Sequence, residues 1–342
     1  MSTLHTTITT PSASTAGKRE IDQQHEGWAL VGRLAVLLPL ALTVLLVAFG
    51  WPAVRSAPHE VPVGLAGPAP AAASAEQGLT RAAGDALRTT RYADEASLRR
   101  GIANREVYGG IVLAPSGPTL LVASAASPVV AQALTAMGRE LAARQGAPLA
   151  TRDVVPLPAK DPRGAGLAAA ALPLTLGGVL PALVAVRFFR RRPDLRVASA
   201  LAVSLVGGMA LAAILRFWFG SVPPSYWAVA LGLSLGMAAT ALALVGLAAV
   251  FGRLGLGLGA AVVLLLGNPL SGLASAPELL PSGWGTLGQL LPPGASATLL
   301  RSTAYFGGAA ATEPVVVLST WVAVGLALTA VAALRKRRAV TA

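Results

Sequence analysis

Long apolar runs alternate along this chain with two stretches in which polar residues are frequent. A helix that crosses the hydrocarbon core of a bilayer needs about 20 apolar residues. Six segments approach or reach that length, at residues 34–51, 168–186, 197–214, 227–251, 256–276 and 315–334. The first run is longer than the apolar part of a secretion signal, and no small-residue cleavage site directly follows it. The pattern therefore predicts an α-helical polytopic membrane protein with six transmembrane helices, the first of them uncleaved.

The longer polar stretch, residues 52–163, has the pattern of a small folded domain. Short apolar runs at 61–67, 107–115, 119–125 and 152–158 predict strands, and the segments 71–87, 94–105 and 127–146 predict helices between them. Asp94 and Glu95 are adjacent carboxylates, but their place at a helix start is typical of capping and not of catalysis. We expect an α/β domain between the first two membrane helices.

Basic residues decide the orientation that the sequence predicts. Six spans put both termini on one side, and the positive-inside rule makes that side the cytoplasm. Of the fifteen basic residues outside the α/β domain, thirteen then lie inside. The expected order is a cytoplasmic tail at 1–27, a transmembrane helix at 28–51, an extracytoplasmic α/β domain at 52–163, and a five-helix membrane domain at 164–342.

Composition excludes several classes of function. The chain of 342 residues is 54% hydrophobic and 12% charged, and it has no cysteine and three scattered histidines, which leaves no thiol site and no metal site. It has no phosphate-binding G-x-x-x-x-G-K-[ST] motif and no hydrolase motif. The six runs contain no Asp, Glu, Lys or His, so the ionisable group that ion-coupled transporters usually need inside the membrane is missing.

The segment 187–196, RFFRRRPDLR, has five arginines and one acid. In a chain of net charge +12, such a run could bind nucleic acid, orient the helices or contact another protein. Its place between two predicted spans favours orientation and excludes a nucleic-acid partner. Two phenylalanines and five planar guanidinium groups exceed what orientation needs, so contact with a cytoplasmic partner stays a second interpretation.

A second, shorter stretch at 267–313 is apolar but interrupted by turn residues. Its prolines and glycines prevent a continuous span, and its aromatic residues are of the type found at membrane interfaces. We expect one or two short helices that lie in or re-enter the outer leaflet and line or gate a pathway. The residues that we assign to this outer gate segment are Asn268, Pro269, Pro281, Trp284, Pro292, Pro293 and Tyr305.

The arrangement resembles the type-2 ABC exporter permeases. It is most similar to the branch with a large external domain after the first helix, which includes the phage-infection-protein-like membrane proteins. The matching stretches are DEASLRRGIANREVYGGIVLAPSGPTLLVASAAS at 94–127 and GNPLSGLASAPELLPSGWGTLGQLLPPGASATLLRSTAYFGG at 267–308.

The resemblance implies a permease subunit, itself without enzyme activity or cofactor, that works as a homodimer or paired permease. A separate ATPase subunit would bind ATP and supply energy for the export of an unidentified, amphiphilic substrate. It further implies that the loop between the second and third helices contacts this ATPase, through Arg187, Phe188, Phe189, Arg190, Arg191, Arg192 and Arg196. The alternative is a non-transporting envelope scaffold or surface receptor. Arginine greatly outnumbers lysine, which suggests a GC-rich gene and a bacterial plasma membrane.

Overall fold

The computed structural model describes residues 13–114, 117–145, 149–222 and 226–341. The chain divides into two compact units, residues 1–51 and 52–342, and each is described by itself. The first unit consists of helix α1, which runs from Ala13 to Val54 and so ends just inside the second unit. Its part Gly27–Val54 is long and apolar enough to cross a membrane.

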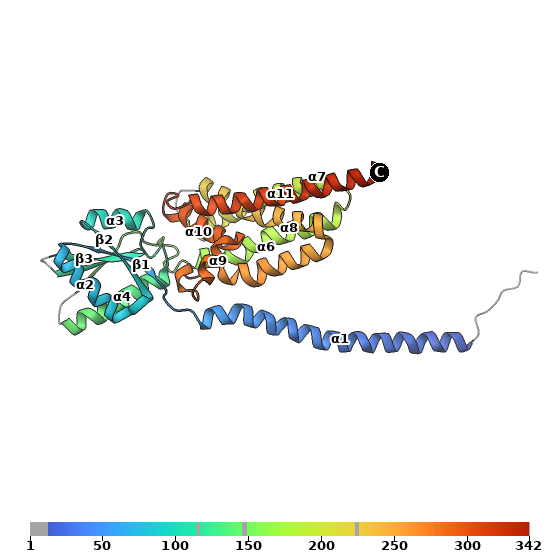
Figure 1. The fold of residues 1–342 in the computed structure, drawn as a ribbon, viewed down its shortest axis with the longest axis horizontal. Coiled ribbons are helices and arrows are strands. Elements are labelled where there is room, and N and C mark those ends of the chain that lie inside the picture. Colours follow the sequence, from blue (N-terminus) through green and yellow to red (C-terminus); the bar gives the residue numbers. More distant parts are fainter. Residues whose placement is uncertain (1–12, 115–116, 146–148, 223–225, 342) are drawn as a thin grey trace, which may run out of the picture. The chain divides into compact units, whose positions relative to one another are not determined.

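Residues 61–153 of the second unit form a five-stranded mixed sheet with helices (Figure 1). The strand order is β2-β1-β3-β4-β5; β1 is parallel to β2 and β3, β3 and β4 form an antiparallel hairpin, and β4 is parallel to β5. The strands are β1 Val61–Ala66, β2 Leu87–Tyr92, β3 Gly109–Ala114, β4 Gly117–Val122 and β5 Ala150–Asp153. The helices are α2 Ala69–Ala83, η1 Gly84–Ala86, α3 Glu95–Ala103 and α4 Pro128–Gln145.

Strand β1 lies inside the sheet, and all six of its residues are buried. This explains its continuous apolar sequence, which is typical of a parallel strand covered on both faces. Strand β2 is an edge strand with mostly exposed or half-buried residues. The sequence LRTTRY lacks an apolar run, and for that reason the sequence pattern did not indicate a strand there.

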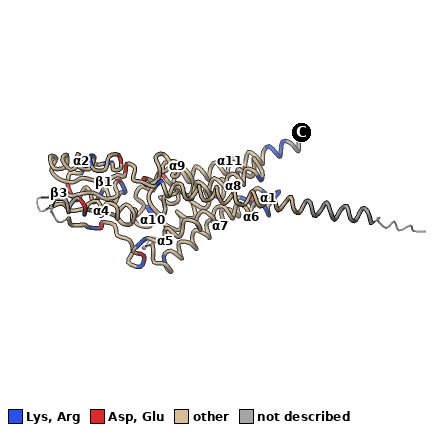
Figure 2. The backbone as a smooth tube through the Cα atoms, turned by 90° about the horizontal axis from the view of Figure 1, so that it is seen from below, with Lys and Arg blue, Asp and Glu red and all other residues tan. Residues whose placement is uncertain are grey.

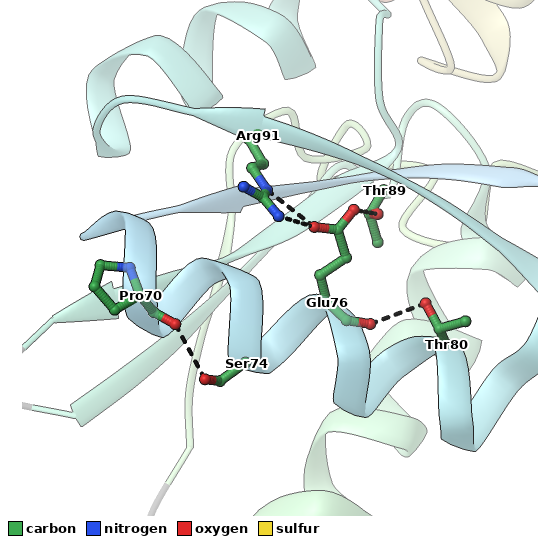
Figure 3. A network of polar contacts seen from close by, with 6 residues as sticks. All are labelled: Pro70, Ser74, Glu76, Thr80, Thr89 and Arg91. Carbon is green, nitrogen blue, oxygen red and sulfur yellow. Dashed lines mark hydrogen bonds and ion pairs between the residues drawn. The ribbon is translucent and has the colours of Figure 1, made fainter.

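Figure 3 shows how helix α2 is held against strand β2. The Glu76 carboxylate accepts hydrogen bonds from Thr89 Oγ1 at 2.9 Å and Arg91 Nε at 2.9 Å. These contacts lower the pKa of Glu76, with the Arg91 hydrogen bond as the largest cause. Helix α3 starts with a capping box, in which Asp94 accepts from the Ser97 amide and Ser97 Oγ accepts from the Asp94 amide. The carboxylate at 94 therefore has the capping role expected from the sequence.

The rest of the second unit is helical. Among the described residues, five helical stretches of the whole chain are long and apolar enough to cross a membrane: Gly27–Val54, Ala165–Phe188, Pro193–Trp218, Tyr226–Gly267 and Thr312–Arg338. The last four comprise α5 Ala165–Ala169 with α6 Ala171–Phe188, α7 Pro193–Ala213 with the π-turn η2 Ile214–Trp218, α8 Tyr226–Val262 with the π-turn η3 Val263–Gly267, and α11 Thr312–Thr341. Helices α6, α7 and α11 all pack against α8, the most buried of these helices.

Helix α8 is broken at Gly252, whose φ of 64° is left-handed and not helical. The chain folds back there, and the two arms of the helix pack against each other. The evidence is Gly259, where an added Cβ atom would lie 2.7 Å from a Leu244 methyl and 2.8 Å from a Leu247 methyl. The predicted runs 227–251 and 256–276 are the two arms of this hairpin. The second arm continues as an α-helix and π-turn to Gly267 and not to 276.

The segment between the second arm and α11 contains four short elements: η4 Pro269–Ser271, η5 Pro277–Leu279, α9 Trp284–Leu290 and α10 Pro292–Tyr305. Glycines allow backbones to touch here. A Cβ atom on Gly288 would lie 2.0 Å from the Leu270 carbonyl oxygen, and one on Gly294 would lie 2.1 Å from that of Gly288. Helix α10 is buried over almost its whole length and packs against α8 and α11.

Candidate functional site

The arginine-rich segment forms a tight turn between α6 and α7. Helix α6 ends at Phe188, where its last carbonyl groups have no partner inside the helix. Arg196 supplies donors from the first turn of α7: its Nε donates to the Phe189 carbonyl at 2.9 Å, and its Nη2 donates to the Arg190 carbonyl at 2.7 Å. Two of the five donors of Arg196 therefore close the turn.

The other predicted docking residues differ in what they contact. Arg192 donates to Asp194 through Nη2 at 2.8 Å and through Nε at 3.2 Å. Phe189 is half-buried. Four of the remaining residues are exposed on the outside of the turn, namely Arg187, Phe188, Arg190 and Arg191. Phe188 has 72% of its surface exposed, and the Arg187 guanidinium lies 5.9 Å from its ring centre.

The helices of the second unit have two chemically different ends. Helices α6 and α8 leave the sheet side and turn at their far ends, and α11 ends in the same direction (Figure 1). The turn after α6 is the arginine segment, and the turn within α8 is at Gly252. The basic residues at that end are Arg187, Arg190, Arg191, Arg192, Arg196, Arg253, Arg335, Lys336, Arg337 and Arg338, whereas Asp194 is the one acid there among the described residues. Figure 2 shows blue segments at the end of α11, and mixed red and blue segments toward the sheet.

At the sheet end, Arg105 joins the sheet domain to α10. It lies between α3 and β3 with a φ of 63°. Its Nη1 donates to the Thr298 carbonyl at 3.1 Å and also to Ser302 Oγ, and its guanidinium lies 5.4 Å from the centre of the Phe306 ring. Burial lowers the pKa of Arg105 to about 10, so the group is still charged at neutral pH. A charged donor thus fixes the sheet domain to a buried helix.

Tyr108 and Glu278 make a second connection. The buried Tyr108 hydroxyl donates to Glu278 Oε2 at 2.7 Å, and burial raises the pKa of this tyrosine. The backbone of η5 also pairs with the segment before β1, because the Ala57 amide donates to the Leu279 carbonyl at 3.0 Å and the His59 amide donates to the Glu278 carbonyl at 2.9 Å. Element η5 is therefore held by the sheet domain from two directions.

Arg301 lies on α10 and has 4% of its surface exposed. Its Nη2 donates to the Leu273 carbonyl at 2.8 Å. The ionisable side chains of Tyr108, Tyr305 and Glu278 lie near its guanidinium group. Arg105 and Arg301 thus place two guanidinium groups near one carboxylate, Glu278, at the sheet end of the helices.

A cavity of about 850 Å³ opens between the sheet domain and the outer segment. Its walls come from the segment before β1, from η1 and β2, from the α3–β3 connection, from η5 and α9, and from the start of α11. The charged residues on these walls are Glu60, Asp85, Arg88, Arg105, Glu278 and Glu313. The size lies within the range of ligand sites, roughly 300–1,000 Å³.

The structure does not bring the predicted outer gate residues together in one site. Asn268 accepts from Thr175 Oγ1 at 3.3 Å, Tyr305 donates to the Ser221 carbonyl at 2.8 Å, and Pro281 lines the cavity. Pro269 begins η4, Trp284 begins α9, and the buried Pro292 and Pro293 begin α10. These residues shape the outer segment, and a role in gating stays a prediction.

The sequence reasoning did not single out the residues that join the two domains. Arg105, Tyr108, Glu278 and Arg301 are separated by up to 196 residues in sequence and meet only in the folded chain. One available signal was Glu278 and Arg301, the two charged residues inside the otherwise uncharged segment 267–308. Groups of this kind must find partners when they are buried.

Comparison with protein-family models, with curated proteins and with solved structures finds no match for this chain.

Proposed function

We propose that the chain is the permease subunit of an ABC-type exporter that moves an amphiphilic substrate outward with energy from a separate ATPase subunit. The observation that carries this proposal is the arginine turn. It presents Arg187, Arg190 and Arg191 beside Phe188, all exposed, at the end of the helices away from the sheet domain (Figure 1). A cationic surface with a protruding aromatic ring suits a partner with carboxylates around an apolar pocket.

The proposal counts six transmembrane helices, since the two arms of α8 on either side of Gly252 count separately. The shorter arm would start at the cytoplasmic side at Gly252, and the arm and the outer segment after it would cross the membrane together. In this arrangement both termini and the arginine turn are cytoplasmic, and the sheet domain is extracytoplasmic, in a bacterial plasma membrane. The support is the charge difference between the two ends, which is what the positive-inside rule requires.

We further propose a homodimer or a pairing with a second permease. The exposed surfaces of α7 and α11 are apolar, with Val203, Val206, Val316 and Val324 among their exposed residues. Such surfaces suit either lipid or a second set of helices. The ATPase remains the partner on which the export proposal depends.

Topology is tested first. The chain has no cysteine, so single cysteines can be introduced without background. On intact cells, an impermeant thiol reagent is expected to label Gln77→Cys on α2 and to leave Asp194→Cys unlabelled until the cells are opened. The reverse labelling contradicts the orientation and the export direction.

ATPase docking is tested by affinity purification of the tagged chain after gentle detergent extraction from its native cells, with any co-purified ATPase identified by mass spectrometry. The double variant Arg190→Lys/Arg191→Lys keeps the charge and loses the bidentate donors, and we expect it to retain several-fold less ATPase. Arg253→Lys is the matched control at the same end, and Phe188→Ala tests the aromatic contact. An ATPase that never co-purifies with the unchanged chain removes the export proposal and favours a non-transporting scaffold or receptor.

A further inference from the structure

The cavity at the sheet end is lined by residues whose backbone conformation is strained. Among the described residues, three that are not glycine have a positive φ: Glu60 at 50°, Arg105 at 63° and Ala310 at 55°. All three lie on the wall of this one cavity. Such conformations cost about 1–3 kcal/mol each and cluster at ligand sites. Their convergence from three distant parts of the chain indicates that the cavity wall has a role besides packing.

The walls carry more negative than positive charge, although the chain as a whole has a net charge of +12. Within the described part of the chain, Glu60, Asp85 and Glu313 are exposed and form no ion pair. Glu278 accepts one hydrogen bond, from the neutral Tyr108 hydroxyl. These four carboxylates face two arginines on the same walls.

The two arginines do not make an anion site. Arg105 directs Nη1 into α10, toward the Thr298 carbonyl and Ser302, and its guanidinium covers the Phe306 ring. Arg88 lies exposed on the edge strand β2. Arg105 keeps its positive charge, since its hydrogen-bond acceptors are neutral. Together with Arg88 it offsets part of the negative charge of the walls, and the four carboxylates remain in excess.

Apolar side chains form part of the remaining walls, namely Pro62, Val107, Leu280, Leu290 and Pro314, beside uncharged polar residues such as Thr286 and Gln289. A hollow with one prevailing sign of charge concentrates ions of the opposite sign. Apolar walls in the same hollow bind the hydrophobic part of a ligand. The combination suits a molecule that carries both a positive charge and an apolar body.

We propose that this cavity binds a cationic amphiphile, meaning an organic amine or onium ion with an apolar body. The inference rests on the export proposal in one respect, since it gives the class of cargo that the permease would release at its sheet end. The binding itself needs no ATPase. It can therefore be tested apart from export.

The test compares two probes of nearly the same size and shape and of opposite charge. Tetraphenylphosphonium and tetraphenylborate are titrated against the purified full-length chain in a neutral detergent by equilibrium dialysis. We expect saturable binding of the phosphonium, no saturable binding of the borate, and weaker phosphonium binding as salt is added.

A triple variant locates the site. Glu60→Gln/Asp85→Asn/Glu313→Gln removes three exposed carboxylates from the walls, and we expect a loss of phosphonium affinity of about tenfold. The matched control, Glu95→Gln/Glu140→Gln/Asp153→Asn, makes the same change in net charge away from the cavity and is expected to bind like the unchanged chain.

Three results would overturn the proposal: no saturable phosphonium binding, borate binding as tight as phosphonium binding, or equal affinities for the two triple variants. None of these results bears on whether an ATPase co-purifies with the chain. Conversely, a chain that binds the phosphonium at this cavity but retains no ATPase is a receptor for cationic amphiphiles and not an exporter.

Discussion

The two ends of the helices in the second unit carry charge in opposite ways. At the arginine end the charge is basic and mostly exposed, and it comes from three short stretches: the α6–α7 turn, Arg253 and residues 335–338 of α11. At the sheet end Arg105, Arg301 and Glu278 are wholly or partly buried, and their partners come from distant parts of the chain. Exposed charge of one sign is a signal for the orientation of helices in a membrane and for contact with partners. Buried charges of both signs determine how the domains pack against each other.

The comparison predicts that small changes at the sheet end destabilise the protein most. For Gly288→Ala the added methyl would lie 2.0 Å from the Leu270 carbonyl oxygen, so α9 must move. We expect a loss of about 3 kcal/mol in stability, measured as a lower midpoint of thermal unfolding in detergent. In Gly257→Ala the added methyl meets nothing within 4 Å, and this control should unfold at or slightly above the original temperature. Equal midpoints for the two variants would show that the outer segment is loosely packed.

Removal of the domain-joining arginine should rank second. Arg105→Ala loses the donors to the Thr298 carbonyl and Ser302 while keeping a non-glycine residue at the same φ. We expect a loss of about 2 kcal/mol in the free energy of unfolding. We also expect faster proteolysis of the α3–β3 connection, which carries residue 105. Arg191→Ala at the opposite end is the control and should change stability by less than about 0.5 kcal/mol. Equal unfolding midpoints for the two variants would show that the buried arginine contributes no more to stability than the exposed one.

A third prediction divides the arginine end itself. Arg196→Ala removes the two hydrogen bonds that close the α6–α7 turn, and we expect a loss of about 1 kcal/mol. The exposed Arg190 should show no such loss when it is replaced by alanine, although the same change should reduce ATPase retention. The measurements are thermal unfolding and co-purification on the same preparations. A variant at 190 that unfolds early would mean that the turn needs every arginine.

The smallest expected effect concerns acid. Hydrogen bonds from Arg91 and Thr89 lower the pKa of Glu76 below its ordinary value of 4.5. Because the folded pKa is lowered, the stabilisation is present above the unfolded value and is lost as pH falls below it through the folded pKa. Unfolding midpoints measured from pH 6 down to about pH 3 should therefore fall less steeply for Glu76→Gln than for the unchanged chain. Identical slopes would assign the acid sensitivity to other carboxylates.

The sequence alone indicated much of the fold, because the relevant signals are local. The apolar runs predicted helices that could cross a membrane, and five helices of sufficient length and apolar composition are present in the described chain. The alternation at 61–67 and 107–125 predicted strands that the sheet contains. Strand β2 escaped this reasoning, since an edge strand is stabilised by pairing with β1 and not by its own pattern.

Within the candidate sites the division is similar. The exposure of Arg187, Arg190 and Arg191 follows from their position in a polar turn, so their type and place in the sequence sufficed. The fixed roles of Arg192 and Arg196 did not follow, because a sequence does not tell which of several arginines reaches a carboxylate or a helix end. The cavity could not be predicted from the sequence at all, because its four carboxylates come from separate elements: Glu60, Asp85, Glu278 and Glu313.

The sequence by itself thus determined that the chain has several helices long and apolar enough to cross a membrane, an inserted α/β domain and one strongly basic end. These properties depend on the hydrophobicity and charge of short stretches of the chain, and both can be read from neighbouring residues in the sequence. Only the tertiary structure decided that Gly252 folds α8 back on itself, that Arg105 fixes the sheet to α10, and that four carboxylates share one cavity. Each of these depends on contacts between residues far apart in the chain, whose geometry exists only after the helices and the sheet have packed.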